Sequence, residues 1–279
     1  MDEYDEEKIK EALAGEFMAK NLSASKRQLT HLILRCMRAY KQEQSAEARV
    51  KDLILDVAFL HEKGLHQQSY SVLKSAKKLA LKHEMFPALL EVFILERQLV
   101  KIVFPRGVED KIETIQAEAK EAIQYVERRF SLQYIYDKLV AASKEADRDV
   151  LKDESKLEQL KQLLDNADLE GQKDHTFFDK YFIYQAQAFY NHLNGDLKTE
   201  HEFATRAVEL WERHPEMLKE HFPKYKAQLF NLLQSCFSNA RFDEMPAIIK
   251  KLRTAPLQNK QDEARTFFYC AYAELQYFI

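Results

Sequence analysis

Glycine and proline are scarce in this chain, and their scarcity limits its fold more than any other feature. The 279 residues include only 5 Gly and 6 Pro, about a third of the share that an average protein carries. Proteins rich in β-structure need both residues at their many tight turns. Long helices joined by short turns need few, and the frequent Leu, Ala, Glu and Lys favour helices. The sequence therefore predicts an all-α protein.

Apolar residues recur at helical spacing through most of the chain. Leu53 and Val57 lie on one face of a first expected helix, which ends before Gly64. A second helix follows at once, so the two form a helix pair. The same two-helix unit is expected again at 177–214 and 222–254. Single helices are expected between and after these pairs, at 87–103, 108–129, 132–147, 154–165 and 262–279.

These segments number about twelve, and their short connections predict consecutive antiparallel helix pairs. Each pair buries its apolar stripe by stacking on the next pair, which produces an α-solenoid. We therefore expect residues 45–279 to form a helical repeat domain. Residues 1–44 are expected to form an N-terminal helical or capping segment, either separate from the repeats or continuous with them. A compact helical bundle is the alternative architecture.

Three of the expected pairs can be aligned on the turn between their two helices. The turn residues are Gly64, Gly195 and Ala240. Such a turn needs a positive φ, which glycine adopts without strain. Twelve residues after each turn stand Ala76, Ala207 and Leu252, at a position that lies against the first helix of the pair. A small residue at this position lets the two helices pack closely.

The aligned pattern resembles the tetratricopeptide repeat and matches it at three pairs, roughly half of the chain. The resemblance implies a right-handed solenoid of helix pairs that binds other proteins. Two features depart from the family pattern. Glu200 lies five residues after its turn, where a small residue such as Ser69 is usual. Gly195 and Ala240 are 45 residues apart, longer than the family period of about 34 residues.

Members of this family bind ligands mainly through the first helix of each pair, whose inward-facing residues line a concave groove. By position, the resemblance implies nine groove residues: Gln185, Phe189 and His192 in the second pair, Phe230, Gln234 and Phe237 in the third, and Ile54, Ala58 and His61 in the first. Aromatic, amide and imidazole groups suit an extended or helical peptide. The alternative is that the three phenylalanines only pack between neighbouring pairs.

Some members of the family hold a chain-terminal carboxylate with a clamp of Lys, Asn and Arg side chains. The corresponding positions here carry Gln185, Phe189, Phe230 and Gln234. The resemblance therefore does not imply a ligand of that kind.

Motifs of catalysis and of cofactor binding are missing from the sequence. The five glycines are too far apart for a dinucleotide-binding GxGxxG motif or a phosphate-binding P-loop. His61 and His66 stand on either side of Gly64, so they would not share one helical face as the histidines of a zinc HExxH motif do. His192 and His201 flank another turn, but the sequence places no further ligand beside them. We expect no catalytic residue, no cofactor and no metal site.

Charge and cysteine content limit the partners and the compartment. A formal net charge of −3 opposes general binding of nucleic acid. No apolar run approaches the ~20 residues that span a membrane, and the acidic start of the chain lacks the basic region of a signal peptide. Cys36, Cys236 and Cys270 are far apart and odd in number, as expected of reduced thiols in a cytoplasmic protein.

The last expected helix, at 262–279, ends on the apolar residues Tyr277, Phe278 and Ile279. Solenoids normally end in a polar capping repeat. Three explanations remain open. The helix caps the stack itself, it mediates self-association with another subunit, or the chain continues in a longer protein.

The sequence predicts a non-catalytic protein–protein interaction scaffold that binds a protein or peptide in the groove. The alternative is a peptide-sensing regulator, whose solenoid changes curvature on binding and whose segment 8–44 supplies a separate effector region. A helical enzyme is the third class, and no group of residues supports it.

Overall fold

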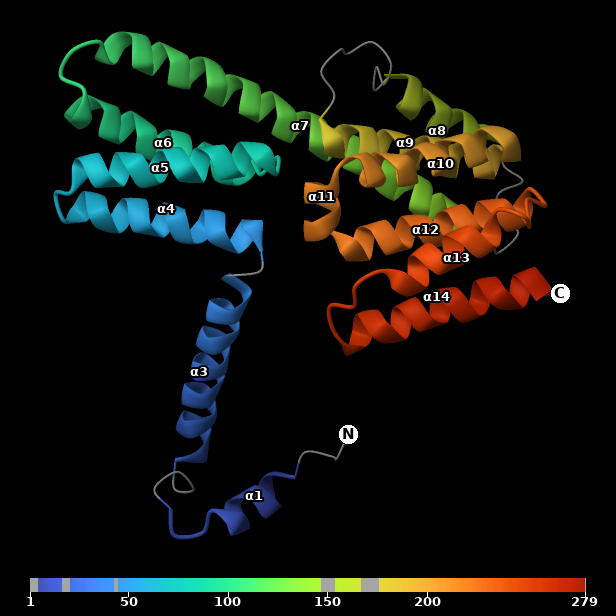
Figure 1. Ribbon diagram of the computed structural model, residues 1–279, viewed down its shortest axis with the longest axis horizontal. Coiled ribbons are helices and arrows are strands. Elements are labelled where there is room, and N and C mark those ends of the chain that lie inside the picture. The colour runs from blue at the N-terminus through green and yellow to red at the C-terminus, as the bar shows by residue number, and fades with distance from the viewer. Residues whose placement is uncertain (1–4, 17–20, 43–44, 147–153, 167–175, 279) are drawn as a thin grey trace.

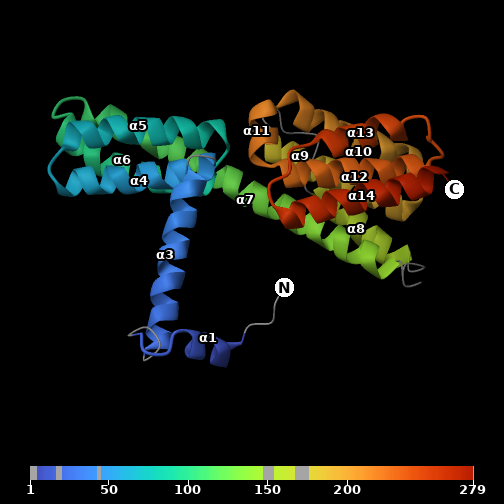
Figure 2. The same cartoon turned by 60° about the horizontal axis from the view of Figure 1, so that its bottom comes forward.

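The computed structural model describes residues 5–16, 21–42, 45–146, 154–166 and 176–278 (Figure 1). These residues form thirteen helices and no strand, which confirms the all-α class. Ile279, the last of the apolar residues at the C-terminal end, lies outside the described residues. The helices gather into two blocks, and both views separate the blocks clearly (Figures 1 and 2).

The N-terminal block contains α4 (Ala46–Glu62), α5 (His66–Lys82), α6 (Phe86–Val103) and the first part of α7 (Val108–Ala146). These helices lie side by side, and the chain reverses direction at each connection (Figure 1). Their apolar stripes meet in one core that includes Val57, Leu73, Ala76, Val92 and Leu99. Because these apolar residues recur at helical spacing, they lie on one face of each helix, and the apolar faces of neighbouring helices pack together.

The C-terminal block contains the rest of α7 and all later helices. Their bounds are α8 (Glu154–Asn166), α9 (Phe177–Asn194), α10 (Leu197–Arg213), α11 (Pro215–Glu220), α12 (Phe222–Ser238), α13 (Met245–Thr254) and α14 (Lys260–Phe278). The largest core lies among α9, α10, α12 and α13. Trp211 is fully buried in it and packs edge-on against Phe177 and Tyr181.

Helix α7 corrects one expectation. Two helices were expected at 108–129 and 132–147, but a single helix runs from Val108 to Ala146. The sequence between these residues has no Gly or Pro. Ser131 does not cap a new helix, because its Oγ donates a hydrogen bond to Glu127 O at 3.1 Å within the same helix. As a result, α7 packs on α6 and on α9 and passes through both blocks (Figure 2).

The three aligned turns have the expected conformation. Gly64, Gly195 and Ala240 have φ of 75°, 77° and 54°. In each turn a backbone N–H reaches back to the carbonyl five residues earlier, at 2.9, 3.0 and 2.8 Å, which is the helix-ending Schellman pattern. The residues twelve positions later are all almost completely buried, as expected: Ala76, Ala207 and Leu252.

The N-terminal helices α1 (Glu6–Ala12) and α3 (Leu22–Gln42) extend away from the two blocks (Figures 1 and 2). Helix α3 contacts α4 near their connection. The apolar side chains of α3 from Leu29 to Tyr40 are exposed, including Ile33 and Met37. None of the described helices is both long and apolar enough to cross a membrane.

Candidate functional site

Four of the nine predicted groove residues meet around one cavity of about 160 Å³ between α9, α10 and α12. Helix α9 contributes Gln185, Ala188, Phe189 and His192, α10 contributes Glu200 and Ala204, and α12 contributes Gln228, Asn231 and Gln234. We call this space the α9–α10–α12 cavity. Three helices therefore supply its walls, and helical spacing on each of them directs the lining residues inward.

The cavity arises where the second helix pair departs from the other two. Seven residues before the turn, the first and third pairs carry Val57 and Leu233, which fill their interfaces and are almost fully buried. The second pair carries the smaller Ala188 at this position, and Ala188 lines the cavity. Missing side-chain volume in a helix interface leaves space when the backbones do not close up.

A buried carboxylate lies on one wall of the cavity. Glu200 stands five residues after the turn, where the first pair has Ser69, whose Oγ donates to Val57 O at 2.8 Å and ties the two helices together. Glu200 is only 8% exposed. Its Oε1 lies 3.5 Å from His192 Nδ1. Its Oε2 is buried and has no hydrogen-bond partner among the described residues.

Gln185 lies on the wall that α9 forms. It is 2% exposed, and its side chain interacts with the Tyr181 hydroxyl group. A buried polar atom without a partner costs roughly 1–3 kcal/mol. Among the lining side chains, Glu200 therefore has an oxygen in need of a partner, Oε2, although neighbouring atoms cover that oxygen.

The remaining wall is apolar and held in place by neighbouring helices. The ring of Phe189 packs edge-on against Tyr136 of α7, with centroids 5.7 Å apart. Ala188 and Ala204 complete this wall. The combination suits a group with an apolar stem and a polar end.

Of the predicted groove residues of the third pair, Phe230 and Phe237 do not line the α9–α10–α12 cavity. Phe230 stacks on Tyr269 of α14, with centroids 4.2 Å apart and planes 13° from parallel. Phe237 packs edge-on against Phe242 in the turn after α12 and remains 41% exposed. Gln234 does line the cavity and also donates to Gln276 Oε1 at 3.1 Å. Helix α14, which is not part of the three aligned pairs, lies beside Phe230.

The predicted residues of the first pair belong to the N-terminal block. Ile54 packs against the core of that block. His61 Nδ1 lies 3.2 Å from His66 Nδ1, beside the Gly64 turn. Ala58 is half-buried on the same helix. None of these residues lines the α9–α10–α12 cavity.

A larger cavity of about 730 Å³ lies at the junction of the two blocks. His83, Glu84, Arg129 and His221 are among its lining residues. Glu84 accepts hydrogen bonds from the backbone N–H groups of Phe177 and its neighbour at 2.6 and 3.1 Å, and its Oε2 lies 3.2 Å from Arg129 Nη2. The Glu84 carboxylate is thus already engaged in joining the blocks.

Burial also acts on the two histidines of the junction. Burial, followed by the positive charge of Lys224, lowers the pKa of His221 to about 4. The pKa of His83 is likewise lowered by burial. Both rings are therefore neutral near pH 7, and they add no positive charge to the junction.

The sequence argument missed several residues of the α9–α10–α12 cavity. Gln228, Asn231 and Glu200 are in the wall but were not among the predicted groove residues. A signal existed for Glu200, because a small residue is usual at its position in the repeat. This departure marks the pair in which the helix interface opens.

No protein-family model, curated protein or solved structure matches the chain. The function of the site is therefore inferred from the geometry, burial and charge of its residues.

Proposed function

We propose that this chain is a non-catalytic protein–protein interaction scaffold, built as a tetratricopeptide-like, right-handed α-solenoid of antiparallel helix pairs. It holds a protein or peptide segment in its groove, and one side chain of that segment enters the α9–α10–α12 cavity. The observation that carries the proposal is the buried carboxylate of Glu200, which lines a cavity with one apolar wall and whose Oε2 has no hydrogen-bond partner among the described residues. The proposal involves no cofactor, no nucleic acid and no membrane, and places the protein in the cytoplasm.

The size of the cavity favours a single side chain over a free metabolite. Its volume is about 160 Å³. An engineered protein cavity of about 150 Å³ is large enough for benzene, whereas pockets for drug-sized ligands span roughly 300–1,000 Å³. A side chain presented by a longer segment fits this space, and the rest of the segment lies outside it.

The chemistry of the cavity favours a lysine or arginine side chain. A cationic end group donates to Glu200 Oε2, and such charge-assisted hydrogen bonds are about twice as strong as neutral ones. The aliphatic stem lies along Phe189 and Ala204. A cation near the face of an aromatic ring gains a further contribution of about 0.5–2 kcal/mol. The partner is therefore a segment with an accessible basic residue.

The state of Cys270 supports a non-catalytic role. Burial raises the pKa of its thiol. Nucleophilic cysteines have a lowered pKa. The Cys270 thiol therefore lacks the environment of a nucleophile.

The experiment uses the full chain as bait for an unbiased displayed peptide library, with Glu200→Gln and Glu202→Gln variants beside the wild type. Glu202 is exposed on the same helix, so its variant is a matched control for charge. Enriched peptides should share a Lys or Arg. Replacing that residue by norleucine, or Glu200 by Gln, should weaken binding about 10- to 100-fold, because a hydrogen bond to a charged group contributes about 1.5–3 kcal/mol.

The control variant should bind these peptides like the wild type. The proposed side-chain pocket is wrong if the enriched peptides share no basic residue, or if Glu200→Gln retains full affinity. The scaffold proposal itself is wrong if the wild type enriches no peptide and retains no protein from a lysate.

The junction cavity favours the second candidate, a peptide-sensing regulator whose curvature changes on binding. The blocks meet at a cavity of about 730 Å³ and share α7, so a change in their angle would move the blocks as rigid units. Segment 8–44 would then be the effector region. Small-angle scattering with an enriched peptide separates the candidates. A changed radius of gyration supports the regulator, and an unchanged one supports a static scaffold.

Self-association through the C-terminal helix is a further part of the proposal. On α14, Phe267, Leu275 and Phe278 are 74%, 63% and 81% exposed. Exposed apolar side chains on one element are typical of a contact surface. Such a surface would let two copies cover each other's terminal helix.

A further inference from the structure

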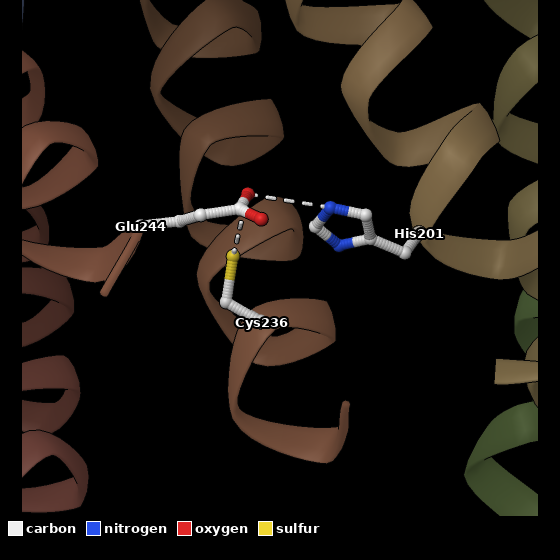
Figure 3. A group of neighbouring side chains, drawn as sticks. All are labelled: His201, Cys236 and Glu244. Atoms are coloured by element: carbon white, nitrogen blue, oxygen red, sulfur yellow. Dashed lines mark hydrogen bonds and ion pairs between the residues drawn. The ribbon is translucent and has the colours of Figure 1, made fainter. Parts of the chain in front are cut away.

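Three potential metal ligands from different parts of the chain converge between α10 and the third helix pair (Figure 3). His201 is on α10, Cys236 is near the end of α12, and Glu244 is the residue before α13. Their ligand atoms all lie within 4.8 Å of one another. We propose that His201, Cys236 and Glu244 bind a zinc ion through the imidazole Nε2, the thiolate and one carboxylate oxygen.

Two of the three distances between the donors are close to those of a tetrahedral zinc site. His201 Nε2 lies 3.3 Å from Glu244 Oε2, and Cys236 Sγ lies 3.9 Å from the same oxygen. Zinc binds nitrogen and oxygen at about 2.0–2.2 Å and sulfur at about 2.3 Å, which separates neighbouring N and O ligands by about 3.3 Å and S and O ligands by about 3.6 Å. The ligand atoms of His201 and Cys236 lie within 4.8 Å of each other, and binding of zinc draws them together.

Residues around the cluster already orient two of the three ligands. Ser235 Oγ lies 3.4 Å from His201 Nδ1, which leaves Nε2 directed at Glu244. Metal-binding histidines usually donate their second ring N–H to such a partner. Arg241 Nη1 pairs with Glu244 Oε1 at 3.0 Å, so the carboxylate presents its other oxygen to His201 and Cys236 (Figure 3). The two carboxylate oxygens thus have separate roles.

The set of donors selects the metal by its chemistry. Thiolate and imidazole ligands suit zinc, whereas magnesium and calcium prefer oxygen ligands. Within the part of the chain that the structure describes, this is the one group of His, Cys and carboxylate residues that meets the spacing of a metal site.

The three ligands differ in exposure, so an ion can reach the site from one side. Cys236 is completely buried and the His201 side chain is 7% exposed, but the Glu244 side chain is 37% exposed. An ion enters past Glu244, and water occupies the fourth position of the tetrahedron. Bound zinc links α10 to α12 and to the start of α13, and so fixes the turn of the third pair.

The test is cobalt and zinc titration of the full chain, reduced and freed of metal by a chelator. Co²⁺ reports its ligands directly, because a thiolate gives a sulfur-to-cobalt charge-transfer band in the near ultraviolet and a tetrahedral site gives intense visible bands. We expect both signals in the wild type to saturate at one equivalent of Co²⁺ and to disappear when Zn²⁺ is added.

Variants assign the signals to the three residues. Cys236→Ser should abolish the charge-transfer band, and His201→Gln and Glu244→Gln should weaken Co²⁺ binding at least tenfold. Cys270→Ser removes a different buried thiol, and Cys36→Ser removes an exposed one, so both should keep the band. Glu244 is partly exposed, and its variant is therefore expected to fold.

A wild type without a charge-transfer band at one equivalent of Co²⁺ would contradict the proposal, whatever the variants do. Persistence of the band in Cys236→Ser, with loss in either control, would also contradict it. Peptide binding by the α9–α10–α12 cavity is measured separately, so this proposal and the proposed function can fail independently.

Discussion

Gly195 and Ala240 hold the same left-handed backbone conformation, with φ of 77° and 54°, but only glycine is suited to it. An L-residue in this region brings its Cβ close to the backbone and costs roughly 1–2 kcal/mol. Ala240 therefore carries strain that Gly195 does not. The turn is still formed, because burial of Cys236, Met245 and Leu252 around it stabilises the pair.

Exchanging the two residue types should change stability in opposite directions. Ala240→Gly should raise the free energy of unfolding by up to about 1 kcal/mol, because relief of strain exceeds the entropy that glycine loses on folding. Gly195→Ala should lower it by about 1 kcal/mol. An added Cβ at Gly195 meets no atom within 4 Å, so this variant measures the backbone cost alone.

Urea unfolding followed by far-ultraviolet circular dichroism provides the measurement for both variants. A loss of stability in Ala240→Gly would show that the positive φ of Ala240 carries no strain.

At the scale of elements, α14 is held by a buried ion pair as well as by apolar contacts. Lys226 of α12 is 1% exposed, and its Nζ lies 2.5 Å from Asp262 Oδ2 of α14. Thr266 Oγ1 lies 3.3 Å from the same ammonium group. The face of α14 that meets α12 is thus partly polar, whereas the apolar Phe267 and Leu275 are exposed.

Breaking this pair should destabilise the protein more than breaking a surface pair. Asp262→Asn leaves the Lys226 charge buried without its partner, at an expected cost of about 3–5 kcal/mol. Lys51→Met, which breaks the exposed pair with Glu47, should cost less than about 1 kcal/mol. Unfolding free energies of both variants in urea give the comparison, and equal losses would mean that burial adds nothing to the pair.

The Lys226–Asp262 pair also makes the free energy of unfolding depend on pH in the acidic range. Burial raises the pKa of Asp262, but hydrogen bonds from Lys226 and the Gln258 N–H outweigh it and hold the pKa below its ordinary value of 3.8. The folded state therefore keeps the carboxylate ionised at a lower pH than the unfolded state. The pair's contribution is complete above the ordinary pKa and is lost as the pH falls through the folded pKa. Asp262→Asn should lack this part of the acid dependence.

At the scale of the whole molecule, two blocks are joined by α7, by the contacts of Glu84 and by a hydrogen bond that the Ala46 N–H donates to Glu220 Oε2 at 3.0 Å. Glu84 lies in the turn between α5 and α6 with a positive φ of 51°. Its carboxylate accepts hydrogen bonds at the N-terminus of α9, where the helix dipole favours negative charge, and pairs with Arg129 of α7. One side chain of the N-terminal block thus contacts the C-terminal block at two helices.

Weakening this contact should reduce the coupling between the blocks. Trp211 is the one tryptophan of the sequence and is buried in the C-terminal block, so its fluorescence reports unfolding of that block alone. Circular dichroism reports both blocks. In the wild type we expect the two signals to change at the same urea concentration.

In Glu84→Gln the two transitions should separate, with a loss of about 1.5–3 kcal/mol for a hydrogen bond to a charged group. Glu113→Gln, on the exposed side of α7, is the control and should keep the transitions together. Coincident transitions in Glu84→Gln would show that α7 and the Ala46–Glu220 hydrogen bond couple the blocks without the Glu84 contacts.

The sequence by itself determined the helical class and most local features. Scarce glycine and proline and helical spacing predicted the all-α fold, and the alignment placed positive φ at Gly64, Gly195 and Ala240. These properties depend on residues within one or two turns of each other, so they are visible without tertiary contacts. The continuous α7 was missed, because a serine can end a helix or bond back within it, and nothing local distinguishes the two.

Tertiary structure alone decided which distant residues meet. The repeat positions identified Gln185, Phe189, His192 and Gln234, yet only packing showed that Ala188 and Glu200 open a cavity among them. Packing likewise placed Phe230 against Tyr269 and brought Cys236 beside His201. Contacts between separate helices depend on how whole elements stack and cross. Small differences in side-chain volume at their interfaces set that geometry, and no single segment of sequence contains it.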